Sequence, residues 1–388
     1  MSVVHIKLAG RLDTGNSDKW YQEISAALAS QRADSLVIDC EKLDYISSSG
    51  LRKLLTLEKT GVHVGCVNVL PEVYEIFEVT GFTRLLDIQR KPRPLEIDDS
   101  ALMARGTVGQ VYRLDEDRVL KVFNRNVTLD LIQRERRYAQ TALAAGIPTA
   151  ISYDVVQVKD CYGIIFELAR SETFSKRLRE NMDDFDTLAD GYVDLLKLVH
   201  RADLGTGALP SAKAIYGQYI DRADYLSDEE RTALHSLVDS VPDRSTALHG
   251  DFHANNIMFQ DGEMVLIDLG DISQGHPVFD LASMFVSHVL VGGYQPAFIQ
   301  AGMGIDVDTC QRLWRHTLRR YFDGATEGTL ERKEELICQF AHVKLALMYA
   351  IAPGLEKYLT WQPLEDARRA LFPRIAEVRS ALQRDDLC

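Results

Sequence analysis

The chain has 388 residues, 46% of them hydrophobic and 26% charged, which predicts two or three soluble domains that each bury a core. Its net charge of −13 argues against nucleic acid or an anionic membrane as the main partner. The six cysteines lack paired or metal-ligand spacing, and no signal-peptide core or uncharged apolar run of about 18 residues occurs, so we expect reduced thiols and a cytoplasmic protein.

Residues 1–90 are predicted to form a small α/β domain. The predicted elements, in chain order, are a strand at 3–9, a helix from about Ser17, a strand at 36–40, a helix around Leu51–Leu55, a strand at 62–69 and a helix from Pro71. Strands that alternate with helices indicate a parallel or mixed sheet covered by helices.

Two segments of this domain, Leu36–Arg52 and Gly81–Asp87, resemble the STAS fold of anti-sigma factor antagonists. The resemblance implies a phosphate acceptor at Ser48 or Ser49, recognised by a partner kinase or anti-sigma factor. A serine run directly before Leu51 is also a good helix N-cap, which explains these serines without phosphorylation. Both interpretations stay open, because phosphate is itself favoured at a helix N-terminus. The sequence of this domain has no group of acidic, basic or metal-binding residues that would form a catalytic site. We therefore expect the domain to bind a protein or to regulate its own chain.

A linker is predicted at residues 91–100, where two prolines and dense charge indicate extended, stiff chain. After it, the segment Ala104–Tyr112, which contains Gly106 and Gly109, lies between strand-like segments. Glycines there would let main-chain N–H groups approach phosphate oxygens, because no Cβ intervenes. The pattern is weak by itself, since any hairpin can hold two glycines.

A single lysine, Lys121, interrupts the apolar strand Val119–Phe123. The helix predicted from about 128 to 145 carries an apolar stripe with Glu135 at its centre. The stripe consists of Leu131, Ile132, Tyr138, Ala139, Ala142 and Leu143. A carboxylate on a buried face needs a cation, and Lys121 is the candidate partner.

The segment His249–Gly270 is predicted to be a short loop followed by a hairpin. Asn256 and Asp268 are each six residues from Gly262, so closure of the hairpin would place them side by side. An amide oxygen and a carboxylate held together suit Mg²⁺. Asp251 lies on the loop that leads into this end of the hairpin, and it is therefore a candidate base.

The spacing His249-x-Asp251-x4-Asn256, followed by Ile267-Asp268-x-Gly270, resembles the aminoglycoside phosphotransferase and choline kinase group, which has the protein-kinase-like fold. The later segment His276–Ala282 resembles the same group. The implied fold is an α/β STAS-like domain followed by an α+β bilobal protein-kinase-like domain with a large helical C-lobe. Its N-lobe would span residues 101–168 and its C-lobe residues 169–388.

The resemblance also implies the role of each candidate residue in an ATP- and Mg²⁺-dependent phosphotransferase. Asp251 would accept or orient the proton of the acceptor hydroxyl, and Asn256 and Asp268 would bind Mg²⁺. Lys121, fixed by Glu135, would hold the α- and β-phosphates.

Further roles concern the adenine and the surroundings of the loop. Val111 would lie on the adenine, and the backbone of Glu167, Leu168 and Ala169 would form the hinge that binds its edge. The remaining assignments are hydrogen bonds that shape the loop for His249 and His253, an auxiliary acid for Asp271 and a structural hydrogen-bond acceptor for Asp280.

The chain departs from protein kinases in having His-Gly-Asp, Asp-Leu-Gly and no later Ala-Pro-Glu, and these departures favour a small-molecule acceptor. Three hypotheses follow. The first is a kinase of a small hydroxylated molecule, with the N-terminal domain regulating it. The second is a protein kinase that acts on Ser48 or Ser49 or on an equivalent serine of a partner. The third is a nucleotide-binding scaffold without catalysis, which the intact Lys, Glu, Asp, Asn and Asp set argues against.

Overall fold

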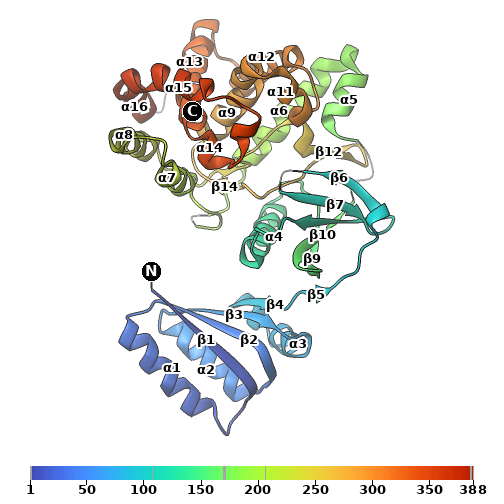
Figure 1. Ribbon diagram of the computed structural model, residues 1–388, viewed down its shortest axis with the longest axis vertical. Helices are drawn as coiled ribbons and strands as arrows, with labels where there is room; N and C mark the ends of the chain where they lie inside the picture. The colour runs from blue at the N-terminus through green and yellow to red at the C-terminus, as the bar shows by residue number, and fades with distance from the viewer. Residues whose placement is uncertain (1, 107, 169–171, 206, 385–386, 388) are drawn as a thin grey trace. The chain divides into compact units, whose positions relative to one another are not determined.

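The computed structural model of the chain describes residues 2–106, 108–168, 172–205, 207–384 and 387. Two compact units share the chain (Figure 1): one comprises Met1–Tyr112, Lys121–Gln133 and Asp154–Ile164, and the other comprises Arg113–Leu120, Arg134–Tyr153 and Ile165–Cys388. Within the described ranges, no helix has both the length and the apolar character needed to cross a membrane.

The N-terminal part is a four-stranded sheet in the order β1-β2-β3-β4, with every neighbouring pair parallel. Its elements are β1 (Val3–Leu12), α1 (Ser17–Gln31), β2 (Ser35–Ile46), α2 (Ser48–Lys59), β3 (His63–Val69), α3 (Pro71–Val79) and β4 (Asp87–Arg90). The strand predicted at 36–40 runs on to Ile46, because Leu43 and Ile46 continue to face the core. The alternation of strands and helices confirms the predicted α/β class.

A six-stranded sheet follows, in the order β5-β9-β10-β8-β7-β6. Its strands are β5 (Arg93–Pro94), β6 (Leu102–Arg105), β7 (Gly109–Arg113), β8 (Arg118–Phe123), β9 (Ser152–Val158) and β10 (Cys161–Glu167). The short β5 lies inside the predicted linker and pairs in parallel with β9, Arg93 opposite Val156. The Leu95 N–H extends this pairing by donating to Gln157 O at 2.8 Å. The extended conformation predicted for the linker is therefore stabilised by a sheet edge.

Helix α4 (Leu129–Ala144) carries Glu135, but its predicted apolar stripe is partly wrong. Ile132 is fully buried, whereas Leu131 is 45% and Leu143 40% exposed. Leu131 is one residue from Ile132 and so points about 100° away around the helix. Leu143 belongs to the last turn of α4. The buried face of α4 is thus narrower than the sequence pattern indicated.

The C-terminal part is mostly helical, as predicted, and shares one large apolar core. Its helices are α5 (Phe174–Glu180), α6 (Phe185–Arg201), α7 (Ala212–Arg222), α8 (Asp228–Asp239), α9 (Val278–Phe285), α10 (Val291–Tyr294), α11 (Pro296–Met303), α12 (Val307–Tyr321), α13 (Glu327–Ala346), α14 (Met348–Ile351), α15 (Gln362–Leu371) and α16 (Ile375–Gln383). Two short antiparallel pairs lie among them: β11 (Ala247–Leu248) with β14 (Ser273–Gln274), and β12 (Ile257–Gln260) with β13 (Glu263–Leu266). Pro373 occupies a 3₁₀ turn between α15 and α16, where a proline cannot donate the backbone hydrogen bond that would continue the helix.

Candidate active site

The loop between β11 and β12 carries Asp251 and begins with a backbone conformation that only glycine adopts easily. Gly250 has a φ of +83°, and a Cβ there would lie 2.3 Å from the carbonyl oxygen of Asp271. The turn that aims Asp251 therefore depends on glycine both for its φ and for the close approach of the Asp271 backbone.

The N–H side of this turn is held by Asp280, a fully buried carboxylate on α9. Asp280 accepts hydrogen bonds from the backbone N–H groups of His249 at 2.8 Å and Gly250 at 2.7 Å, and from Nε2 of His200 at 3.0 Å. Burial alone would raise the pKa of Asp280, but the hydrogen bond and charge of His200 hold that pKa below its ordinary value. These contacts confirm the prediction that Asp280 is a structural acceptor.

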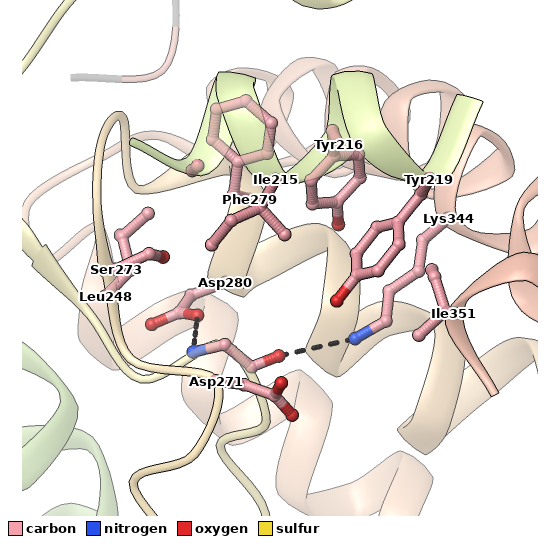
Figure 2. Close-up of a pocket in the computed structure, with 12 residues that line it drawn as sticks. Ile215, Tyr216, Tyr219, Leu248, Asp271, Ser273, Phe279, Asp280, Lys344 and Ile351 are labelled. Carbon is pink, nitrogen blue, oxygen red and sulfur yellow. Dashed lines mark hydrogen bonds between the residues drawn. The ribbon is translucent and has the colours of Figure 1, made fainter. Parts of the chain in front are cut away.

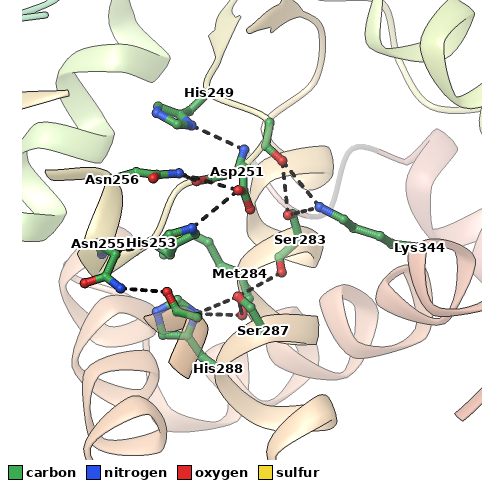
Figure 3. A network of polar contacts seen from close by, with 12 residues as sticks. His249, Asp251, His253, Asn255, Asn256, Ser283, Met284, Ser287, His288 and Lys344 are labelled. Atoms are coloured by element: carbon green, nitrogen blue, oxygen red, sulfur yellow. Dashed lines mark hydrogen bonds and ion pairs between the residues drawn. The ribbon is translucent and has the colours of Figure 1, made fainter. Parts of the chain in front are cut away.

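Asp251 is half-exposed and is surrounded by donors (Figure 3). Nε2 of His253 lies 3.4 Å from its Oδ2, and Nδ2 of Asn256 donates to its backbone carbonyl at 2.9 Å. Nδ1 of His253 accepts from the Asn255 N–H at 3.2 Å, so the ring proton sits on Nε2 and faces Asp251. Desolvation by the loop would raise the pKa of Asp251, but His253 and the charge of Lys344 hold it well below its ordinary value. Asp251 is thus a carboxylate at neutral pH.

His249 shapes the same loop from its buried side. Its Nδ1 accepts from the Asp251 N–H at 3.2 Å. Burial lowers the pKa of His249, which keeps the ring neutral. The predicted roles of His249 and His253, hydrogen bonds that shape the loop, are confirmed.

The hairpin register is one residue away from the predicted one. Gln260 pairs with Glu263 across a turn of Asp261 and Gly262, and both turn residues have positive φ. The symmetry axis thus lies between residues 261 and 262, and the residue facing Asn256 is Ile267, whose N–H donates to Asn256 O at 2.9 Å. The prediction that Asn256 and Asp268 face each other was wrong, because it placed the axis on Gly262.

Asp268 follows one residue later, in a left-handed conformation with a φ of +60° that leaves the strand direction. Its Oδ1 lies 3.8 Å, and Oε2 of Glu135 lies 3.3 Å, from the position that a Cβ on Gly270 would take. The carboxylates of Asp268 and Glu135 therefore border the same small space next to Gly270.

The residues predicted to contact the phosphates and the adenine include several in the first unit. The Gly106 N–H donates to Gly109 O at 2.8 Å and closes the turn between β6 and β7. A Cβ on Gly109 would lie 2.2 Å from Val122 O, so glycine is required there for packing as well. Val111 pairs with Ala104, and Nζ of Lys121 lies 4.9 Å from the ring centre of Phe123. Lys121 and Glu135 belong to different units, and their pairing stays a prediction.

Two of the three predicted hinge residues are described by the structure, and Ala169 lies outside the described residues. The Glu167 N–H donates to Ile151 O at 2.9 Å, and the Leu168 N–H donates to Asp117 O at 2.7 Å. The Glu167 carboxylate accepts from Nε2 of Gln260 at 2.7 Å. Both backbone N–H groups are thus already used within the chain.

A cavity that the sequence did not predict opens beside the loop (Figure 2), and it is lined by α7, α9, α13, α14 and the residues around Gly250 and Asp271. Tyr216 and Tyr219 of α7 and Lys344 of α13 point into it. Burial raises the pKa of Tyr219 to about 12, and that of Tyr216 also rises, so both hydroxyls stay protonated at neutral pH.

The two candidate phosphate acceptors differ in accessibility. Ser48 is exposed, whereas Ser49 is half-buried and its Oγ lies 2.8 Å from Oγ of the buried Ser17. The N-cap of α2 is Ser47, whose Oγ accepts from the Gly50 N–H at 3.4 Å. Neither candidate is therefore the helix cap, and capping explains neither serine.

Comparisons with known proteins cover both parts of the chain. Residues 103–310 match the phosphotransferase enzyme family, and residues 2–93 match the STAS domain. Over 86 residues, 21% of this chain and 72% of the relative, the sequence is 34% identical to a protein of Bordetella bronchiseptica named as an anti-sigma factor antagonist, BtrV.

Two solved structures are similar to the C-terminal part. One is the streptomycin–ATP complex of APH(2″)-IIa, with 19% identity and a TM-score of 0.44 over 71% of this chain and 92% of that one. The other is a choline/ethanolamine kinase family protein of Mesorhizobium loti, with 14% identity and a TM-score of 0.47 over 73% of this chain and 92% of that one.

Proposed function

Because this chain belongs to the phosphotransferase enzyme family and carries a STAS domain, we propose that it transfers the γ-phosphate of ATP, with Mg²⁺, to a hydroxyl group of a small molecule. The observation that carries the proposal is the setting of Asp251. Its carboxylate stays ionised beside the His253 ring, on a loop that borders a cavity. Such a carboxylate is suited to orient an acceptor hydroxyl and receive its proton.

The side chains near the hairpin fit a divalent cation. Asn256 uses its Nδ2 to donate to Asp251 O, so its Oδ1 is the amide atom left to bind a cation. Asp268 would supply the second oxygen, and water and phosphate oxygens would complete the shell that Mg²⁺ prefers. When bound, Mg²⁺ would neutralise charge on the nucleotide phosphates.

The nucleotide would be held by the residues that the sequence pattern singled out for it. Lys121, fixed by Glu135, would bind the α- and β-phosphates, with Gly106 and Gly109 leaving room beside them. Val111 would cover the adenine. Since the N–H groups of Glu167 and Leu168 are already bonded, the adenine edge would be bound by the other backbone groups of Glu167, Leu168 and Ala169.

The acceptor would occupy the cavity beside Gly250. Its walls combine aromatic and aliphatic side chains with the protonated hydroxyls of Tyr216 and Tyr219. Asp271, Asp280 and Lys344 also line it, and polar groups placed among apolar and aromatic side chains are typical of small-molecule sites. This supports a compact hydroxylated molecule as the acceptor.

The test is transfer of label from [γ-³²P]ATP with Mg²⁺ to a panel of alcohols that includes aminoglycosides, choline, sugars and nucleosides. Thermal-shift screening of the same panel would show which compounds bind. We expect transfer to at least one class of acceptor, and Asp251→Ala should abolish it. A chain that does not turn over ATP would refute the proposal, and binding of ATP without turnover would leave the nucleotide-binding scaffold.

The exposure of Ser48 supports a second candidate, a protein kinase that acts on a STAS-domain serine. Ser48 is accessible at the first turn of α2, where phosphate is electrostatically favoured. Label that appears on Ser48 of the purified chain and disappears in Asp251→Ala would support this candidate. A chain that turns over ATP while Ser48 and added STAS domains stay unlabelled would exclude it. In either case we propose that the STAS domain contacts a protein partner or regulates its own chain.

A further inference from the structure

The backbone carbonyl oxygen of Gly250 is held by Lys344, which lies 94 residues later in the chain. Nζ of Lys344 donates to Gly250 O at 3.3 Å and to Oγ of Ser283, and Oγ of Ser283 donates to the same carbonyl at 3.2 Å. Asp280 holds the N–H of Gly250 from the other side. Side chains of two helices, α9 and α13, thus fix both polar groups of the residue that precedes Asp251: Figure 2 shows the contacts of Asp280 and Lys344, and Figure 3 those of Ser283 and Lys344.

The charge of Lys344 is not needed to satisfy these acceptors. Its two bonding partners are a neutral carbonyl and a neutral hydroxyl, and its side chain is partly buried. Burying part of an ammonium group costs free energy that a neutral donor would not cost. The charge of Lys344 instead acts on Asp251, whose pKa it lowers, and Lys344 also lines the cavity together with Gly250 and Asp271.

We propose that Lys344 is a positioning residue for phosphoryl transfer: its ammonium fixes the Gly250 peptide and thereby aims the Asp251 side chain at an acceptor in the adjoining cavity. This inference rests on the proposed function for its catalytic consequence, but not for the geometry of the loop. Lys344 lies outside residues 103–310, the part of the chain that matches the phosphotransferase enzyme family.

The experiment compares Lys344→Met, Lys344→Arg and the control Arg332→Met with the wild-type full-length chain. Arg332 is exposed on the same helix and bonds to Thr329 within that helix, so its replacement removes one positive charge from α13 without touching the loop. Two quantities are measured: hydrolysis of [γ-³²P]ATP with Mg²⁺, where water serves as the acceptor, and amide hydrogen exchange of residues 249–256.

In Lys344→Met we expect exchange in the loop to become about tenfold faster, because a hydrogen bond from a charged donor is lost. The kcat for ATP hydrolysis should fall by roughly 10- to 100-fold, because small misplacements of a reacting group have effects of this order. The KM for ATP should stay within about twofold if Lys344 makes only non-nucleotide contacts. Lys344→Arg should restore part of both losses, and Arg332→Met should match the wild type.

A change in exchange without a change in kcat, or a change in kcat without a change in exchange, would overturn the proposal. So would wild-type values of both in Lys344→Met. If the wild-type chain neither hydrolyses ATP nor phosphorylates any acceptor of the panel, the proposed function fails, and the exchange measurement still decides whether Lys344 holds the loop.

Discussion

Replacement of Gly250 by alanine tests the geometry of the catalytic loop, and the hairpin provides a matched control. Gly250 has a φ of +83°, and an added Cβ would lie 2.3 Å from Asp271 O and 2.8 Å from Asp271 Cβ. Gly262 has nearly the same conformation, with a φ of +88°, but a Cβ there would have nothing within 4 Å. The two substitutions therefore share the conformational penalty and differ in the steric clash.

The expected magnitudes follow from these two terms. An alanine in the left-handed region costs about 1–2 kcal/mol, which applies to both variants. Overpacking against a backbone carbonyl costs about 1–3 kcal/mol more and applies to Gly250→Ala alone. We expect a loss in the free energy of unfolding of about 2–5 kcal/mol for Gly250→Ala and about 1–2 kcal/mol for Gly262→Ala.

Urea unfolding followed by tryptophan fluorescence would measure the difference, because the fully packed Trp314 reports on the helical part. ATP turnover should fall by roughly 100-fold in Gly250→Ala, since relief of the clash moves the peptide before Asp251. It should be nearly unchanged in Gly262→Ala. Equal stability and equal turnover in the two variants would refute the close approach of Asp271 as the reason for glycine at position 250.

The remaining predictions concern chemistry, pH and the STAS domain. Asp251→Asn should lower acceptor phosphorylation by roughly 10²- to 10⁴-fold, and turnover at the wild-type rate would remove Asp251 from the chemistry. Burial lowers the pKa of His288 from 6.5 to about 4. Below pH 6.5 the unfolded chain therefore binds a proton at His288 that the folded chain does not bind. The contribution of the neutral ring to the free energy of unfolding is complete above pH 6.5 and declines towards pH 4. The loss amounts to about 3 kcal/mol at pH 4, and urea unfolding from pH 7.5 to 4 should show a shallower decline in His288→Leu than in the wild type; equal slopes would contradict this. Ser49→Ala should destabilise the STAS domain by about 0.5–1.5 kcal/mol through its lost contact with Ser17, whereas Ser48→Ala should stay within about 0.5 kcal/mol, and the reverse order in thermal unfolding would contradict the structure.

The sequence was sufficient for features that depend on local periodicity and spacing. Alternating strands and helices in residues 1–90 predicted the α/β class, and the spacing of Asp251, Asn256 and Asp268 predicted the kinase-like family. The break at Pro373 also followed from local chemistry, because proline removes a helix hydrogen bond.

Features that depend on the contact of one segment with a neighbouring segment were predicted less accurately. The hairpin itself was expected, but its register depended on whether the turn is centred on Gly262 or between Asp261 and Gly262. A two-residue turn with both φ values positive decides this, and the choice moves every facing pair by one residue. The difference in exposure between Ser48 and Ser49 was not predicted either, because Ser49 is covered by its contact with Ser17 of another helix.

Contacts between distant segments were decided by the tertiary structure alone. Lys344 interrupts an apolar run in the same way as Lys121, so the sequence held a signal, but its partner Gly250 is 94 residues away. The cavity beside Gly250 likewise requires α7, α9 and α13 to meet. Local pattern determines which face of a helix is apolar, whereas the packing of one helix against another determines which of its polar side chains reaches the site.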